Sequence, residues 1–199
     1  MKQNILVIDD DIDICKMLHR DLSNEGYNAS YALSGSTGIE QVKKHNAPAL
    51  ISPNMATGVN VLFKMASILT QYLQDWDIEV IESHHHRKAD VPSGTALAIA
   101  KTICDTLGCD PEETLKFGRS KGPNKRKIGA KNEIGVHAIR AGDIVGDHTI
   151  LFAGKGERIE LKHQAHSRNR FASSAIRAIK FIVRQDENRI YNMKDGLNL

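Results

Sequence analysis

Residues 1–51 alternate between short apolar runs and stretches with helical spacing. The apolar or alternating runs are residues 5–8, 27–33 and 49–51. Between the first two, Ile14, Leu18 and Leu22 recur every four residues, which indicates a helix with one apolar face. A second helical stretch follows the Gly- and Ser-rich turn at residues 34–38. This order predicts an α/β half-sheet of the form β-α-β-α-β with parallel strands.

After residue 52 the pattern changes. Apolar residues recur at helical spacing in three segments, residues 59–73, 97–107 and 171–183. Apolar and polar residues alternate, as in half-buried strands, in residues 78–81, 133–140, 147–152 and 158–163. Gly-rich turns separate the last three of these strands. We therefore predict an α+β domain with at least four strands after the half-sheet.

The composition is that of an ordinary soluble domain. The 199 residues are 41% hydrophobic and 26% charged, and the formal net charge of +3 is too small to indicate a nucleic-acid partner. Cys15, Cys104 and Cys109 form no Cys-x-x-Cys pair, which favours a reduced, cytoplasmic protein. The chain shows no signal peptide, and no apolar run approaches the roughly 20 residues of a membrane span.

The most informative stretch is residues 82–96, Glu-Ser-His-His-His-Arg-Lys-Ala-Asp-Val-Pro-Ser-Gly-Thr-Ala. It follows one predicted strand and precedes a predicted helix, so three histidines, an arginine and a lysine are expected in a strand-to-helix loop. Ser93 is placed to cap the helix, and Gly94 and Thr95 carry backbone N–H groups at its positive end. Cations beside a helix N-terminus favour an anionic ligand such as a carboxylate or phosphate.

This stretch resembles the signature of the dihydrodipicolinate reductase (4-hydroxy-tetrahydrodipicolinate reductase) family of lysine biosynthesis. The pattern Glu-x-His-His-x-x-Lys-x-Asp-x-Pro-Ser-Gly-Thr-Ala combines residue types that no fold requires together. The resemblance begins near Ser52 and continues through residues 133–135, 140–149, 152–154, 156–160, 163–168 and 171–172. It implies a nucleotide-binding domain joined to a substrate domain with a mixed sheet, assembled as a homotetramer.

The resemblance also implies roles for individual residues. Reduction of a cyclic imine dicarboxylate needs a hydride from a nicotinamide, a proton donor, and cations that hold the carboxylates. His84 and Lys88 match the family's acid/base pair, with Lys88 as the final proton donor. The residues that match the substrate-carboxylate site are His85, Gly94 and Thr95. The hinge segment that contacts the nicotinamide end of the cofactor corresponds to Ser52, Pro53, Asn54 and Met55.

A metal site at His84, His85 and His86 is a rival interpretation of the same stretch. Neighbouring residues of a strand point to opposite faces, so only His84 and His86 would share one. Two ligands are too few for a zinc site without a carboxylate or cysteine partner. We therefore predict no metal at this stretch.

Residues 1–51 resemble the first half of a response-regulator receiver domain. The match lies in residues 5–11, 33–35 and 38–40. The resemblance implies that Asp9 and Asp10 help to bind Mg²⁺, whereas the simpler interpretation of residues 9–11 is a solvated strand end with a helix cap. Ser52 and Pro53 stand where a receiver has its phosphoacceptor aspartate, so phosphotransfer is not supported.

The reductase family carries a Gly-rich turn after its first strand, and this chain has the three acids of residues 9–11 there. We therefore expect impaired binding of NADPH or NADH. The predicted division is a receiver-like segment at residues 1–51 and the reductase substrate and oligomerisation domain at residues 52–199. The function implied is NAD(P)H-dependent reduction of 4-hydroxy-tetrahydrodipicolinate to tetrahydrodipicolinate. The alternative is a non-enzymatic, receiver-like or oligomerising scaffold that binds dicarboxylates at most.

Overall fold

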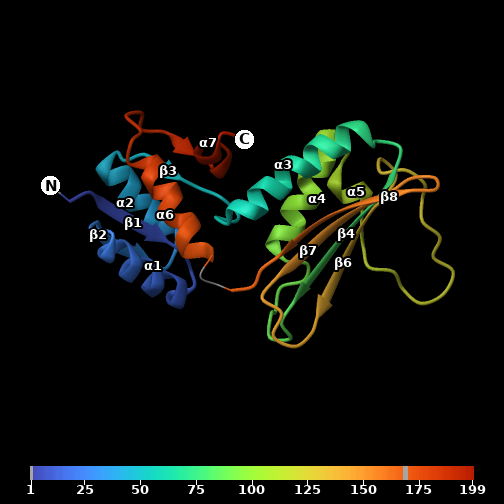
Figure 1. Ribbon diagram of the computed structural model, residues 1–199, viewed down its shortest axis with the longest axis horizontal. Helices are drawn as coiled ribbons and strands as arrows, with labels where there is room; N and C mark the ends of the chain where they lie inside the picture. The colour runs from blue at the N-terminus through green and yellow to red at the C-terminus, as the bar shows by residue number, and fades with distance from the viewer. Residues whose placement is uncertain (1, 168–169) are drawn as a thin grey trace. The chain divides into compact units, whose positions relative to one another are not determined.

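The structure is a computed structural model that describes residues 2–167 and 170–199. Arg168, and the side chains of Phe171 and Ala172, belong to the resemblance given above and lie outside the described residues. The chain forms two compact units, one of residues 1–57 together with 168–199 and the other of residues 58–167. Figure 1 shows the first unit in blue and red and the second in green to orange. No helix in the described ranges is long and apolar enough to cross a membrane.

The first unit combines the N-terminal elements with the C-terminal ones. Its elements are β1 (Asn4–Ile8), α1 (Ile12–Asn24), β2 (Asn28–Ala32), α2 (Gly35–His45), β3 (Ala49–Leu50), α6 (Arg170–Ile182), β9 (Ile190–Tyr191) and α7 (Met193–Leu197). Strands β1 and β2 are parallel and in register from Asn4 to Ile8, as predicted. The core between α1 and α6 contains Leu22 and Ile179, so the C-terminal helix covers the N-terminal elements.

Strand β3 does not join β1 and β2, so the expectation of one three-stranded parallel half-sheet is wrong in this respect. It pairs in parallel with β9, with Leu50 opposite Tyr191. The Tyr191 side chain is buried and its ring packs edge-on against Phe181 of α6, with the ring centroids 5.5 Å apart. The C-terminal segment therefore supplies the strand partner of β3.

The second unit is an α+β domain built on one mixed sheet. Its elements are α3 (Thr57–Tyr72, which starts at the boundary of the unit), β4 (Asp77–His84), α4 (Gly94–Leu107), α5 (Pro111–Thr114), β5 (Leu115–Phe117), β6 (Ile134–Arg140), β7 (Asp147–Ala153) and β8 (Arg158–Gln164). The strand order is β5-β6-β4-β7-β8, with the first three strands parallel and the last two antiparallel to their neighbours. The prediction of a mixed sheet with at least four strands is confirmed. The short elements α5 and β5 were not predicted.

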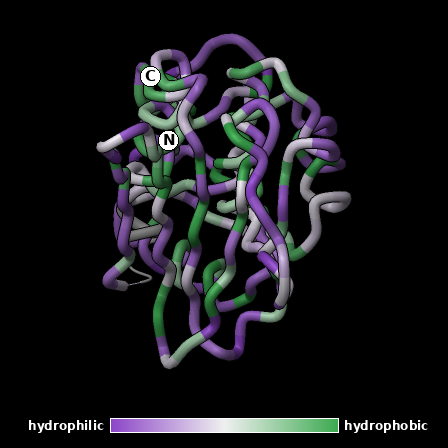
Figure 2. The backbone as a smooth tube through the Cα atoms, turned by 90° about the vertical axis from the view of Figure 1, so that its right-hand side faces the viewer, coloured by the Kyte–Doolittle hydropathy of each residue, from purple (hydrophilic) through white to green (hydrophobic). Residues whose placement is uncertain are grey.

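One face of this sheet is covered by helices. Figure 1 shows α3 and α4 on the same side of the strands, and Figure 2 shows apolar and polar positions interspersed along the backbone. On central strand β4 every second residue is buried, beginning at Ile78 and Val80. The predicted apolar stripe of α3 is buried at Val59, Leu62, Phe63 and Ala66. The same alternation carries two polar residues, Glu82 and His84, into the covered face.

Candidate functional site

The site lies where β4 ends and α4 begins. Strand β4 is longer than the sequence predicted and ends at His84, so the expectation that all three histidines lie in a loop is wrong for His84. The strand continues because Glu82 and His84 keep the alternation, with Glu82 paired to both β6 and β7 and His84 paired to β6. Ser93 caps α4 as predicted, with Oγ accepting the Ala96 N–H at 3.2 Å.

Glu82 is fully buried and makes four hydrogen bonds. Its Oε1 accepts from Arg140 Nη2 at 2.8 Å and from the Ser93 N–H at 3.1 Å. Its Oε2 is 2.8 Å from Arg140 Nη1 and 2.5 Å from His84 Nδ1. A buried carboxylate is stable only when it is paired and hydrogen-bonded, and here every acceptor position has a partner. Glu82 therefore joins the strand end, the helix cap and β6.

Two opposing effects set the ionisation of Glu82. Burial raises the pKa of its carboxyl, but the hydrogen bonds from Arg140, His84 and the Ser93 N–H together hold the pKa below its ordinary value. The carboxylate in turn raises the pKa of Arg140, chiefly through the hydrogen bond between them. The pair is therefore a carboxylate facing a guanidinium at neutral pH.

His148 of β7 completes the buried cluster. It lies opposite Glu82 in the sheet, and its Nε2 shares a hydrogen bond of 3.2 Å with Ser93 Oγ. Its ring meets that of His84 edge-on, with the centroids 5.2 Å apart. Gly146 lies at the other side of His84, because a Cβ at this glycine would stand 2.9 Å from His84 Nε2. The His84 imidazole therefore has neighbours from β4, from β7 and from the turn just before β7.

The loop after β4 carries the predicted cationic side chains. Lys88 Nζ donates to Asp90 Oδ1 at 2.7 Å, and the side chains are 22% and 57% exposed respectively, so the pair is reachable from solvent. The hydrogen bond from Lys88 lowers the pKa of Asp90. His85 is half-buried, and its carbonyl accepts the Lys88 N–H at 3.1 Å. The loop thus holds His85 and Lys88 at one turn, next to the end of β4.

Gly94 and Thr95 are the first two residues of α4, as predicted. At Gly94 no atom of the described residues lies within 4 Å of the place where a Cβ would stand. The space beside Gly94 is therefore open. A helix N-terminus favours an anion, because its N–H groups point outward and the helix dipole is positive there. The site thus presents a helix N-terminus, a lysine and a buried imidazole within one continuous segment.

The predicted cofactor segment lies in the other compact unit. Ser52 Oγ donates to the Asn54 carbonyl at 2.8 Å, and the Ala56 N–H donates to Asn54 Oδ1 at 2.8 Å. Pro53 and Met55 complete this turn between β3 and α3. The segment is therefore a hydrogen-bonded turn directly before a helix.

The three acids after β1 cap the next helix. Asp11 Oδ1 accepts from the Asp13 N–H at 2.9 Å and the Ile14 N–H at 3.2 Å, and it caps α1 as the simpler interpretation predicted. Asp9 Oδ1 accepts from the Asp11 N–H at 2.9 Å. Burial raises the pKa of Asp9, in spite of that hydrogen bond. No group of three or more His, Cys, Asp or Glu side chains in the described ranges is placed to hold a metal ion.

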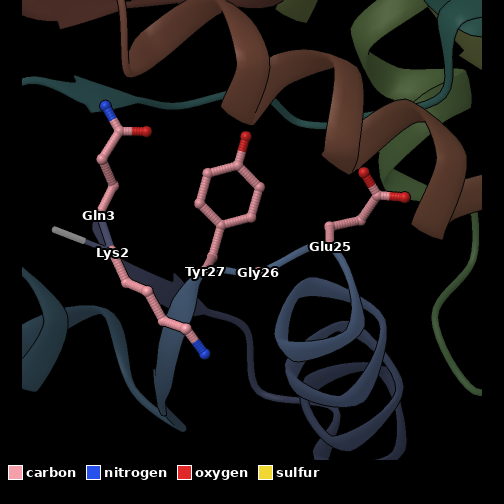
Figure 3. Close-up of a pocket in the computed structure, with 5 residues that line it drawn as sticks. All are labelled: Lys2, Gln3, Glu25, Gly26 and Tyr27. Carbon is pink, nitrogen blue, oxygen red and sulfur yellow. The ribbon is translucent and has the colours of Figure 1, made fainter.

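A surface hollow of about 670 Å³ occurs in the first unit, lined by Lys2, Gln3, Glu25, Gly26 and Tyr27 (Figure 3). Figure 3 shows its side chains pointing in different directions rather than converging on one point. None of the predicted site residues lines it. The chemistry of the chain therefore points to the β4–α4 segment rather than to this hollow.

Sequence reasoning gave no role to Glu82, Arg140 or His148, although all three lie in segments quoted for the resemblance. One signal was available for Glu82. It falls two residues after Val80 on an alternating strand, which places an acid on the covered face. The partners of that acid come from β6 and β7, and their positions depend on strand pairing. The sequence pattern alone does not determine that pairing.

Fold and site together define an α+β domain in which a buried imidazole–carboxylate pair lies beside the N-terminus of a helix. A family model described as "Dihydrodipicolinate reductase, C-terminus" matches residues 58–197. The chain belongs to the dihydrodipicolinate reductase family.

Relatives and one solved structure agree with this assignment. The chain is 48% identical over 161 residues to the 4-hydroxy-tetrahydrodipicolinate reductase of Methanobrevibacter smithii, a match to 81% of this chain and 58% of the relative. It is 45% identical over 171 residues to that of Syntrophus aciditrophicus, with 82% and 62% covered. The fold resembles a dipicolinate-bound dihydrodipicolinate reductase from Paenisporosarcina sp. TG-14, with a TM-score of 0.62 and 21% identity over 96% of this chain and 73% of that one.

The chain thus spans about three fifths of the length of these two curated relatives, 58% and 62%. The share of this chain that matches the first relative, 81%, is larger than residues 52–199 alone supply. The likeness to that relative therefore begins upstream of residue 52.

Proposed function

We propose that this chain carries the substrate-binding and proton-transferring part of a 4-hydroxy-tetrahydrodipicolinate reductase of lysine biosynthesis, acting in the cytoplasm. The reaction is the NAD(P)H-dependent reduction of 4-hydroxy-tetrahydrodipicolinate to tetrahydrodipicolinate. The observation that carries the proposal is the buried Glu82–His84 pair directly before the open N-terminus of α4. The curated relatives bear the name of this reductase, and the structural neighbour was solved with dipicolinate bound.

The residues of the site have two roles, binding of a substrate carboxylate and proton transfer. His85 and the backbone N–H groups of Gly94 and Thr95 hold a carboxylate of the substrate at the helix N-terminus. Lys88 donates a proton to the substrate, with His84 as its acid/base partner. In the structure Lys88 is held by Asp90 at 2.7 Å, so an incoming carboxylate competes with Asp90 for the same ammonium group.

The first strand–helix junction does not fit the pyrophosphate of a dinucleotide. The Asp11 carboxylate already occupies N–H groups at the start of α1, and Asp9 and Asp10 lie beside it. A further anion about 4 Å from one carboxylate is repelled by roughly 1–4 kcal/mol at effective dielectric constants of 80 to 20. Binding of NADPH or NADH is therefore impaired here, and contact with the nicotinamide end falls to residues 52–55 by family resemblance.

The remaining assignments are also part of the proposal. The division remains a receiver-like segment at residues 1–51 and the reductase segment at residues 52–199, with the likeness to the reductase relative reaching into the residues just before 52. The resemblance supports a homotetramer formed through the substrate-domain sheets. The alternative function is a scaffold that only binds dicarboxylates. It would be indicated if the chain binds the dicarboxylate but shows no turnover with either cofactor.

Titration calorimetry with pyridine-2,6-dicarboxylate tests the substrate site. We expect binding to the native chain and a weakening of about 10- to 100-fold in Lys88→Ala and in His85→Ala, because each removes one hydrogen bond to an anion, worth about 1.5–3 kcal/mol. Lys101→Ala is the matched control, because Lys101 is an exposed lysine of α4 that pairs with Asp105 at 3.1 Å. Equal affinity in Lys88→Ala and Lys101→Ala would contradict the assignment.

Cofactor binding is tested separately with the single tryptophan, Trp76. NADPH or NADH added at micromolar concentrations is expected to leave the Trp76 fluorescence nearly unchanged. A reductase assay with both cofactors completes the test. Tight NADPH binding with rapid turnover would show that the first unit binds the nucleotide in spite of its acids.

A further inference from the structure

The four hydrogen bonds of Glu82 determine which ring nitrogen of His84 carries a proton. A carboxylate offers about four acceptor positions on its two oxygens. Three of its partners are donors in every state, namely the two Arg140 Nη atoms and the Ser93 N–H. The fourth partner, His84 Nδ1, is a donor only when that nitrogen is protonated.

The fourth partner must therefore be a donor as well. An ionised Glu82 has no proton to give, and Arg140 and the Ser93 N–H favour the ionised form. The separation of 2.5 Å between His84 Nδ1 and Glu82 Oε2 is shorter than the usual range of about 2.7–2.9 Å for a nitrogen donor to a carboxylate, so a proton must lie between the two atoms. An unprotonated Nδ1 at this distance would place two lone pairs against each other.

We propose that Glu82 is a positioning residue that fixes the proton of His84 on Nδ1 and leaves Nε2 to exchange a proton during the reaction. This inference rests on the proposed function for its catalytic meaning. Its structural part, the position of the proton, stands on the hydrogen-bond geometry alone.

The surroundings of Nε2 agree with this assignment. Gly146 lies beside it, and any side chain there would stand within 2.9 Å of this nitrogen, so the glycine keeps that edge of the ring clear. His148 faces the ring edge-on, and its own Nε2 is occupied by Ser93 Oγ. Arg140 is directed at the Glu82 carboxylate rather than at the imidazole.

Glu82 also ties the imidazole to the ligand site. The same carboxylate that holds His84 through Oε2 holds the cap residue Ser93 through Oε1. Because Glu82 is hydrogen-bonded to both, it keeps the distance and orientation between the His84 imidazole and the N-terminus of α4 constant. Proton transfer to a bound substrate requires such fixed positions.

Glu82→Gln changes the protons while keeping the shape of the side chain. A glutamine amide has one oxygen, so it serves either the Ser93 N–H or His84 Nδ1–H as an acceptor, and its NH₂ group faces the other. The Ser93 N–H is always a donor, whereas His84 Nδ1 can accept as well as donate, so the amide oxygen is expected to face Ser93. The NH₂ group then donates to His84 Nδ1, and the imidazole proton moves to Nε2. The same change of tautomer follows when the aspartate of a serine-protease triad becomes asparagine.

The experiment is a long-range ¹H–¹⁵N correlation spectrum of the full chain with ¹⁵N-labelled histidine, recorded at about pH 8, above the ordinary imidazole pKa of about 6.5. His84→Gln assigns the signals. We expect a protonated Nδ1 in the native chain and an unprotonated Nδ1 in Glu82→Gln. The reductase kcat is expected to fall by at least about 10-fold, because loss of the carboxylate that fixes the histidine tautomer lowers kcat by about 10⁴-fold in a serine-protease triad.

Glu79→Gln is the matched control. Glu79 lies on the same strand with its side chain on the other face, and its Oε2 is 2.7 Å from His137 Nε2. This variant should leave the His84 signals and kcat unchanged, and a shared loss in both variants would mean a general effect on the sheet and would overturn the proposal.

The native spectrum by itself decides the structural part, whether or not Glu82→Gln folds. A native Nδ1 without a proton, or a Glu82→Gln spectrum identical to the native one, would overturn the proposal. A protonated native Nδ1 that is lost in Glu82→Gln, in a chain without measurable reductase turnover, would support the positioning role and count against the proposed function.

Discussion

Replacement of Arg140 by methionine is expected to destabilise the second unit strongly at neutral pH. Arg140 makes two hydrogen bonds of 2.8 Å to the fully buried Glu82, and a further one of 2.6 Å to the Asp90 carbonyl. Arg140→Met leaves the Glu82 carboxylate buried with only His84 and a backbone N–H as partners. Removing one member of a buried ion pair costs about 3–5 kcal/mol.

The loss should depend on pH in a defined direction. In the native chain the folded pKa of Glu82 lies below its unfolded value of about 4.3, so its contribution is present above that pH and is lost as the pH falls through the folded pKa. Without Arg140, burial raises the folded pKa above the unfolded value. The variant then recovers stability as Glu82 becomes protonated, and the difference from the native chain shrinks as the pH falls from 7 toward the unfolded pKa of Glu82.

Urea unfolding followed by Trp76 fluorescence measures this difference, because Trp76 lies in the second unit and packs against Gly154. Arg158→Met is the control, because Arg158 forms an exposed pair with Glu160 on β8, and such pairs contribute about 0–1 kcal/mol. A loss below about 1 kcal/mol in Arg140→Met, or a difference that does not change with pH, would refute the reasoning.

Three shorter predictions follow from the same structure. Gly146→Ala should lower kcat and cost about 1–3 kcal/mol of unfolding free energy, because its Cβ would stand 2.9 Å from His84 Nε2; unchanged kinetics would contradict the packing. Cys104 should resist iodoacetamide at about pH 8 in the folded chain, because burial raises the pKa of its thiol to about 12; mass spectrometry of the labelled peptides measures this, with half-buried Cys109 as the internal comparison. Light scattering should give about four times the chain mass of 22.0 kDa, and a monomer at micromolar concentration would contradict the tetramer.

The local features of the site were predictable from sequence, because they depend on neighbours along the chain. The cap at Ser93, the left-handed Gly108 that ends α4 and the cap at Asp11 each follow from residue type and position relative to an apolar stripe. The strands of the mixed sheet followed from alternation, and β6, β7 and β8 lie within one or two residues of the predicted ranges.

Tertiary structure alone decided which residues meet. The alternation of apolar and polar residues predicts that Glu82 faces the helices. It does not predict that Arg140 of β6 and His148 of β7 lie beside Glu82, because that depends on the register across three strands. The pairing of β3 with β9 also could not be predicted from local pattern. Strand β9 lies some 140 residues further along the chain, and no local pattern links it to Leu50. The sequence by itself thus determined the loop after β4 and the helix N-terminus that follows it. Strand pairing determined the buried network that orients His84, because hydrogen bonds between distant segments form only once the sheet is assembled.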